Sequence, residues 1–140
     1  MRATLLIAVI LVSCLLLSGC GGSEEDDAMA AVCSSRDAIA KQVDGLQSLT
    51  LATATTSQVT ESMQAIRDDL ATISDNREKL SDDRRDEVQA ANDAFAGQVR
   101  ELAGTIGRTV SIEGATAQVE SSLNQLAASY RDTFGQIDCS

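Results

Sequence analysis

The chain has no histidine, tryptophan or proline, and its aromatic residues are limited to two phenylalanines and one tyrosine. Histidine is the most frequent general base at neutral pH and a common zinc ligand, so its absence disfavours the usual hydrolase and zinc-site chemistries. The lack of proline removes the strongest helix breaker. Basic residues are also scarce, with eleven Lys and Arg against twenty-one Asp and Glu and a net charge of −10. That balance argues against nucleic-acid binding, which needs clustered basic side chains.

What remains is a composition typical of a folded protein. Hydrophobic residues make up 44% of the 140 positions and charged residues 23%, which is usual for a globular domain. A chain of this length suits one domain rather than two.

The first nineteen residues have the features of a secretory signal. Arg2 follows the first Met, and no charged residue occurs from Ala3 to Leu17. A basic start followed by a short apolar run is typical of a signal peptide, and the run is short for a membrane-spanning helix. We therefore predict a signal peptide over 1–19, with an uncleaved N-terminal anchor as the alternative.

The apolar run ends in the sequence Leu-Ser-Gly-Cys at 17–20. This tetrapeptide resembles the lipobox of bacterial lipoproteins, in which cleavage precedes the cysteine and its thiol carries a diacylglycerol. The resemblance implies a lipidated Cys20, a membrane partner through that lipid, and a position on the extracytoplasmic face of the cell membrane. A relaxed lipobox also ends at Cys14, but three leucines follow it, so Cys14 is interpreted as part of the apolar run.

A polar stretch separates this cysteine from the rest of the chain. Residues 20–27 comprise Cys20, two glycines, a serine and four acidic residues, and we predict that they form a flexible acidic tether. Cleavage would remove Arg2, one of the eleven basic residues, so the mature chain would carry a net charge of −11. Anionic headgroups repel such a surface, and attachment would therefore depend on the lipid.

Apolar residues beyond the tether recur every three or four positions, which is the pattern of amphipathic helices. The pattern predicts an all-α domain over 28–140, with helices near 28–48, 57–79, 82–107 and 113–137. The spacing of the stripes favours an up-down-up-down four-helix bundle with coiled-coil-like packing. The clearest stripe comprises Val59, Met63, Ile66, Leu70, Ile73 and Leu80.

The predicted breaks depend on local composition. Residues 50–56 are rich in threonine and alanine, and Thr55 with Gln58 fits a capping box. The apolar register slips near Ser81, where a new helix is expected to begin, although one long bent helix is the alternative. Gly107 is expected to end the third helix, and Ser111 with Glu113 to begin the fourth.

Two cysteines, Cys33 and Cys139, lie near the two ends of the predicted domain. Exported proteins reach oxidising compartments, where such thiols pair. An even number of antiparallel helices brings both cysteines to one end of the bundle, whereas three helices would separate them by a helix length. We therefore predict a disulfide that joins the bundle's ends. A redox or metal-binding pair is the alternative, but the spacing is not Cys-x-x-Cys and no histidine is present.

No residue pattern indicates catalysis or a cofactor. The acidic pairs do not match the spacing of a calcium loop, and the chain's two lysines, Lys41 and Lys79, do not stand in a Ser-x-x-Lys motif. Gly97 and Gly104 lie one heptad apart on the third helix and are interpreted as exposed positions rather than a site of close approach. We predict a protein that is not an enzyme, with no catalytic, cofactor or metal residues. The acidic pairs are Asp68-Asp69, Asp82-Asp83 and Asp86-Glu87.

The helical body, with an ending that contains Tyr130, Phe134 and Cys139, resembles small uncharacterised secreted helical proteins of high-GC Gram-positive bacteria. This resemblance implies no known activity. We expect a non-enzymatic envelope module that binds another protein or a wall component, or else contributes to envelope structure. The alternative is a carrier or sensor that holds a small apolar ligand between its helices, in a cavity lined by Phe95, Leu126 and Tyr130.

Overall fold

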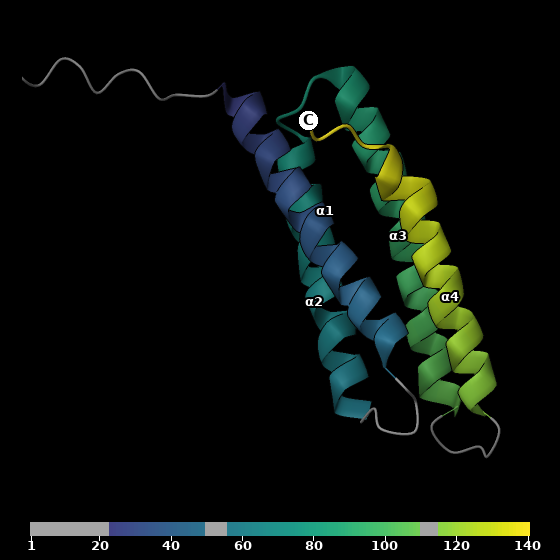
Figure 1. Cartoon of the computed structure of the whole chain (residues 1–140). Coiled ribbons are helices and arrows are strands. Elements are labelled where there is room, and N and C mark those ends of the chain that lie inside the picture. Colours follow the sequence, from purple (N-terminus) through teal and green to yellow (C-terminus); the bar gives the residue numbers. More distant parts are fainter. Residues whose placement is uncertain (1–22, 50–55, 110–114) are drawn as a thin grey trace, which may run out of the picture.

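The computed structural model of the chain describes residues 23–49, 56–109 and 115–140, and within these ranges the chain is almost wholly helical (Figure 1). The predicted all-α four-helix fold is confirmed, and the second and third helices are separate rather than one bent helix. The elements are α1 (Glu24–Ser48), α2 (Thr56–Arg77), α3 (Asp82–Thr109), α4 (Ala115–Thr133) and the short 3₁₀ helix η1 (Phe134–Gln136).

The four helices run alternately up and down, and helices that follow one another in sequence lie side by side (Figure 1). α1 packs on α2, α3 packs on α4, and the contacts of α2 with α3 and of α1 with α4 close the ring. Among these neighbours α1 and α2 share the most extensive contact, and α1 and α4 the least. The bundle is therefore built of two helical hairpins, and the seam between α1 and α4 is its least extensively packed interface.

The start of α1 differs from the sequence prediction. Ser23 and Asp26 form a capping box, in which each side chain accepts a hydrogen bond of 3.2 Å from the other residue's backbone N–H. This arrangement satisfies free N–H groups, and acidic side chains in the first turn are favourable beside the positive end of the helix dipole. Residues Glu24 to Asp27 therefore form the first turn of α1 and not part of the predicted tether.

The connection between α2 and α3 is a tight turn that confirms the predicted break. Leu80 donates its N–H to the carbonyl of Arg77 at 3.0 Å, and its side chain is only 2% exposed. α3 then begins at Asp82, with the N–H of Arg85 bonded to the carbonyl of Ser81 at 2.8 Å. The buried leucine fixes the turn against the core, and the serine precedes the new helix as expected.

The prediction that Gly107 ends the third helix is wrong, because α3 continues to Thr109. A glycine inside a helix costs about 1 kcal/mol relative to alanine, which a helix of 28 residues tolerates. The fourth helix ends earlier than predicted, at Thr133, and continues as η1. The predicted caps at Thr55 and at Ser111 with Glu113 lie outside the described residues.

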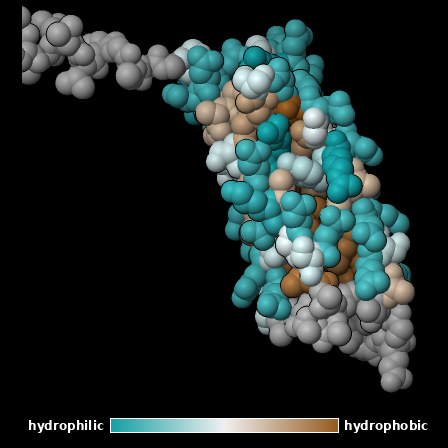
Figure 2. Space-filling view, viewed as in Figure 1, coloured by the Kyte–Doolittle hydropathy of each residue, from teal (hydrophilic) through white to brown (hydrophobic). Residues whose placement is uncertain are grey.

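The core lies along the axis of the bundle, and it contains the apolar stripes predicted from the sequence. Leu49, Ile106 and Tyr130 pack against this core but remain partly exposed. Figure 2 shows hydrophilic side chains over most of one face, with apolar side chains visible between the helices. The largest fully buried side chains are Phe95, Phe134, Ile39, Leu46, Ile66, Ile73, Leu102, Leu126, Val32, Val88 and Val99.

Candidate functional site

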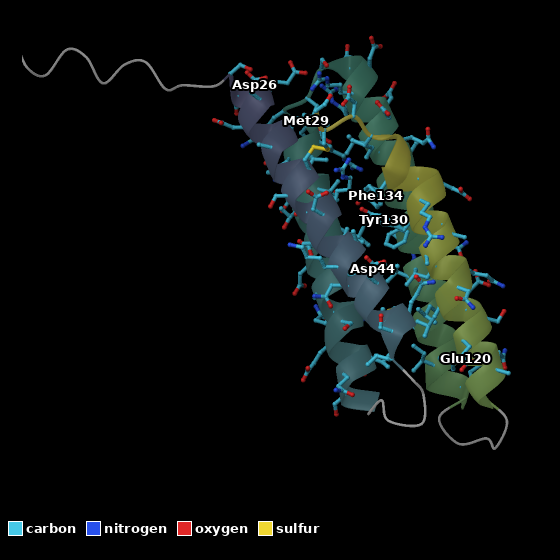
Figure 3. The ribbon with its side chains drawn as sticks, viewed as in Figure 1. Asp26, Met29, Asp44, Glu120, Tyr130 and Phe134 are labelled. Atoms are coloured by element: carbon cyan, nitrogen blue, oxygen red, sulfur yellow. A yellow bond between two sulfur atoms is a disulfide. The ribbon has the colours of Figure 1, made fainter. Side chains whose placement is uncertain are left out.

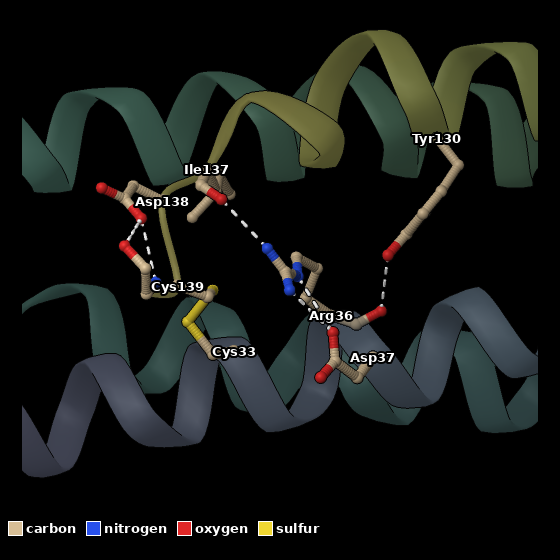
Figure 4. The surroundings of a disulfide bond; sticks show 8 residues. Cys33, Arg36, Asp37, Tyr130, Ile137, Asp138 and Cys139 are labelled. Carbon is tan, nitrogen blue, oxygen red and sulfur yellow. Dashed lines mark hydrogen bonds and ion pairs between the residues drawn. A yellow bond between two sulfur atoms is a disulfide. The ribbon is translucent and has the colours of Figure 1, made fainter.

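The disulfide joins the N-terminal half of α1 to the non-helical segment that follows η1 (Figure 4). The Cα atoms of Cys33 and Cys139 are 5.8 Å apart, although 106 positions separate the residues in sequence. Both residues are partly exposed. The predicted pairing is confirmed, and with it the argument that an even number of helices places both cysteines at one end.

Arg36, one turn beyond Cys33 on α1, connects that helix to the end of the chain (Figure 4). Its Nη1 donates a hydrogen bond to the carbonyl of Ile137 at 3.0 Å, and its Nε and Nη2 contact Oδ1 of Asp37 at 3.1 and 2.9 Å. Its backbone carbonyl accepts a hydrogen bond of 2.9 Å from the hydroxyl of Tyr130. One residue therefore makes polar contacts with both α4 and the C-terminal segment.

Tyr130 lies in the seam between α1 and α4 (Figure 3). Its ring packs against Phe95 at 5.8 Å and Phe134 at 5.8 Å, and Phe95 meets Phe134 edge to face at 5.5 Å. Burial raises the pKa of Tyr130, and the acidic side chains of Asp37 and Asp44 add to that effect while Arg36 opposes it. The hydroxyl stays protonated at neutral pH and can donate to the Arg36 carbonyl.

Replacing Tyr130 with Phe is expected to destabilise the bundle by about 1 kcal/mol, the usual net contribution of one hydrogen bond. The ring contacts would remain, so the loss would report the hydroxyl. Urea unfolding followed by circular dichroism measures the change. Phe134→Leu is the matched control for ring packing, and a Tyr130→Phe variant as stable as wild type would contradict the assigned hydrogen bond.

Glu25, in the first turn of α1, contacts the turn between α2 and α3. Its Oε1 accepts a hydrogen bond from the backbone N–H of Ser81 at 3.2 Å. Hydrogen bonds from the hydroxyl and the backbone of Ser81 hold the pKa of Glu25 below its usual value. Nearby, Nζ of Lys79 lies 3.9 Å from a carboxylate oxygen of Glu24.

Because the pKa of Glu25 is lower in the folded than in the unfolded chain, its contribution to stability is present above its unfolded pKa and disappears as pH falls through the folded pKa. We therefore expect Glu25→Gln to lower the melting temperature at pH 7, and this difference from wild type to shrink as the pH falls through the folded pKa of Glu25. Thermal melts across this range test the expectation. Glu24→Gln is the control, and an equal pH dependence in both variants would contradict the role of Glu25.

Two surface hollows lie between described elements. The larger, about 460 Å³, lies between α1 and α2 and is lined by Gln42, Gly45, Leu49, Gln58, Glu61, Ser62 and Ala65. The smaller, about 290 Å³, is walled by the disulfide together with Asp26, Met29, Ala30, Arg84, Asp138 and Ser140. Asp26 and Met29 lie at the N-terminal end of α1 (Figure 3). The second hollow thus places the disulfide beside solvent.

Asn92 is a buried polar residue on α3 that belongs to no motif in the sequence. The residue is only 6% exposed, and its Oδ1 has no hydrogen-bond partner among the described residues. A signal was present, because Asn92 stands between Val88 and Phe95 at helical spacing on the buried stripe. Leaving a buried acceptor unpaired costs about 1–3 kcal/mol.

We expect Asn92→Leu to raise the free energy of unfolding by about 1 kcal/mol, since an apolar side chain of similar size removes the unpaired acceptor. The matched variant Asn92→Asp places a charge at the same position and should destabilise. Chemical denaturation of the three proteins measures both effects. A Leu variant less stable than wild type would indicate that Asn92 has a partner in solution.

The structure also places the other residues considered in the sequence. Asp82 pairs with Arg85 at 3.2 Å, and Asp68 accepts a hydrogen bond from Gln64 at 2.8 Å. Within the described ranges, no group of three or more His, Cys, Asp or Glu is placed to hold a metal ion. A Cβ added at Gly97 would meet no atom within 4 Å, and one at Gly104 would meet only the guanidinium of Arg108.

Cys20 and Cys14 lie outside the described residues. In the ranges that the structure describes, no helix combines the length and apolarity needed to cross a bilayer. Comparison of the chain with known protein families, with curated proteins and with solved structures finds no match.

Proposed function

We propose that the chain is a membrane-anchored extracytoplasmic lipoprotein whose helical bundle is a non-enzymatic interaction or structural module of the cell envelope. The observation that carries the proposal is the Leu-Ser-Gly-Cys sequence at 17–20 immediately before a capped bundle. Only Gly21 and Gly22 separate Cys20 from the capping residue Ser23. The lipid would hold the chain at the membrane, and the bundle would be its working part.

The position of the helix start bears on how the bundle would meet the membrane. Four residue steps separate Cys20 from Glu24, and an extended chain spans at most about 3.6 Å per residue. The acidic first turn of α1 would therefore lie within about 15 Å of the lipidated residue. Anionic headgroups repel such a surface, which favours attachment through the lipid alone.

The disulfide supports the extracytoplasmic location. Disulfides form and persist in oxidising compartments and are rare in the cytosol. The geometry of Cys33 and Cys139, with Cα atoms 5.8 Å apart, suits a bridge without movement of the backbone. The disulfide and the signal-like N-terminus are separate features, and both support an extracytoplasmic location.

The aromatic side chains favour an interaction module over a carrier of apolar ligands. A carrier would need an unfilled cavity near Phe95, Leu126 and Tyr130. Phe95 and Phe134 are fully buried, and both pack against the Tyr130 ring. The rings occupy much of the space that an apolar ligand would use.

Chemical crosslinking in intact envelopes tests the proposed interaction. The mature chain has two lysines, and both are exposed. Lys79 lies in the turn after α2, close to Glu24 at the start of α1, whereas Lys41 lies in the second half of α1. An amine-reactive reagent should therefore couple a protein partner through these two positions. We expect the reproducible crosslink, identified by mass spectrometry, to depend on Lys41, which lies farther from the anchor.

The matched variants Lys41→Arg and Lys79→Arg keep the charge and remove the reactive amine. Loss of the crosslink in Lys41→Arg alone would support a partner on the part of the bundle away from the membrane. Failure of both amine- and carboxyl-reactive reagents to capture a protein would contradict the proposal. A small apolar molecule that co-purifies with the chain in native mass spectrometry would favour the carrier instead.

A further inference from the structure

Both cysteines of the disulfide line a hollow at the surface of the bundle. Cys33 and Cys139 are both partly exposed and wall the hollow of about 290 Å³ at the tether end. The hollow's other lining residues include exposed side chains such as Asp26 and Asp138. An incoming thiolate would therefore have room to approach a sulfur without unfolding of the bundle, unlike at a disulfide sealed in a core.

The segment that carries Cys139 is suited to detach. Residues 137–140 follow η1 and are not helical. Their release would break only the turn of η1, which the hydrogen bond from the N–H of Ile137 to the carbonyl of Phe134 closes at 3.2 Å. Besides the bridge, the hydrogen bond from Arg36 to the Ile137 carbonyl and the buried Ile137 side chain hold the segment, and Cys139 packs against the core. The hydrogen bonds of Ser140 to Asp138 lie within the segment and do not tie it to α1.

The bridge also closes the least extensively packed interface of the bundle. α1 and α4 share less contact than the other neighbouring helices. Several of their contacts are polar, including Tyr130 to Arg36 and Gln47 to Asn124. Ile137 of the segment and Val32, which precedes Cys33 on α1, are both buried. Because fewer contacts hold α1 to α4 than to α2, loss of the bridge would allow apolar surface to open at the α1–α4 seam.

We propose that Cys33–Cys139 is a thiol-exchange site, reduced by a dithiol protein of the Cys-x-x-Cys class, and that reduction releases residues 137–140 and uncovers an apolar surface on α1. One thiolate of the dithiol attacks a bridge sulfur, forms a mixed disulfide and expels the other cysteine as a thiolate, which takes up a proton. The second thiolate of the dithiol then displaces the remaining cysteine. Two electrons pass to the chain, and the dithiol becomes a disulfide.

The inference extends the proposed function by giving the interaction module a redox-controlled surface. The inference rests on the proposed function in one respect, because the extracytoplasmic location determines the compartment in which the dithiol protein would act. The chemistry itself can be measured on the purified chain, so failure of the lipoprotein proposal and failure of this one are distinguishable.

The first experiment measures access to the bridge in the full chain, purified in detergent with the bond intact. Dithiothreitol is expected to reduce the native bond within about tenfold of its rate in denaturant, and reduced thioredoxin should reduce it without denaturant. A bond reached only through global unfolding would react at least about 10³-fold more slowly in the native chain, in proportion to the unfolding equilibrium. That result would overturn the proposal.

The second experiment measures what reduction releases. In a Cys33→Ser/Cys139→Ser variant, hydrogen exchange over 24–36 and 130–137 should accelerate by at least tenfold more than in α2 and the centre of α3, where only the loss of global stability acts. Binding of an apolar fluorescent dye should rise in parallel. Unchanged exchange, or a uniform increase over all helices, would overturn the release. The control Arg36→Met removes the hydrogen bond but keeps the bridge, and equal exposure in that variant would show that the disulfide is not the switch.

Discussion

Replacing Cys33, Cys139 or both with serine is expected to lower the melting temperature by about 10 °C or more, while helical content at low temperature stays nearly unchanged. The bridge sits at the end of the bundle, between α1 and a non-helical segment. Its removal therefore breaks no intrahelical hydrogen bond. The stabilisation would come mainly from restricting the unfolded chain.

The expected size follows from the length of the closed loop. The two cysteines are 106 positions apart, and the chain-entropy treatment assigns about 4.7 kcal/mol to a loop of roughly 100 residues. Measured losses are usually about 2–4 kcal/mol, against a total stability of about 5–15 kcal/mol for a typical domain. With three aromatic residues in the whole chain, the core has few large side chains to compensate.

Thermal melts by circular dichroism on the chain from Gly21 onward provide the measurement. The two single variants and the double variant should melt at the same temperature, because each loses the same bond. Reductant should bring wild type to that temperature and leave the double variant unchanged. Equal melting of oxidised wild type and the double variant would show that the bridge does not stabilise the fold.

Replacing Cys20 with Ala is expected to remove most of the chain from the membrane fraction or to leave the signal uncleaved. A single acyl chain holds a protein at a bilayer only marginally, whereas two chains hold it stably, at about 0.8 kcal/mol for each buried methylene. The bundle is not expected to compensate, because the acidic surface at its tether end is repelled by anionic headgroups.

Membrane fractionation and the intact mass of the protein test this expectation together. Cys14→Ala is the matched control, since it changes the cysteine that lies within the predicted signal and should leave both readouts as in wild type. A Cys20→Ala protein of normal mature mass that stays in the membrane fraction would contradict the lipoprotein proposal.

The sequence by itself determined the helical architecture. Stripes such as Val59, Met63 and Ile66 recur at helical spacing, and the same residues are buried in the structure. Burial of one apolar face is the dominant stabilising term for an amphipathic helix, so the pattern of the face predicts both the helix and its orientation. The positions of Cys33 and Cys139 predicted the number of helices, because only an even number of antiparallel helices brings the two residues to the same end of the bundle.

The tertiary structure decided what depends on contacts between distant residues. The bond from Arg36 to the Ile137 carbonyl joins positions 101 apart, and the bond from Ser81 to Glu25 joins positions 56 apart. Polar side chains of this kind leave no periodic signal, because their partners are set by how the helices dock. Helix ends behave similarly: the capping box of Ser23 and Asp26 extends α1 into the expected tether, and Gly107 stays helical. Local propensities at such positions differ by only about 1 kcal/mol, so packing and caps determine where each helix ends.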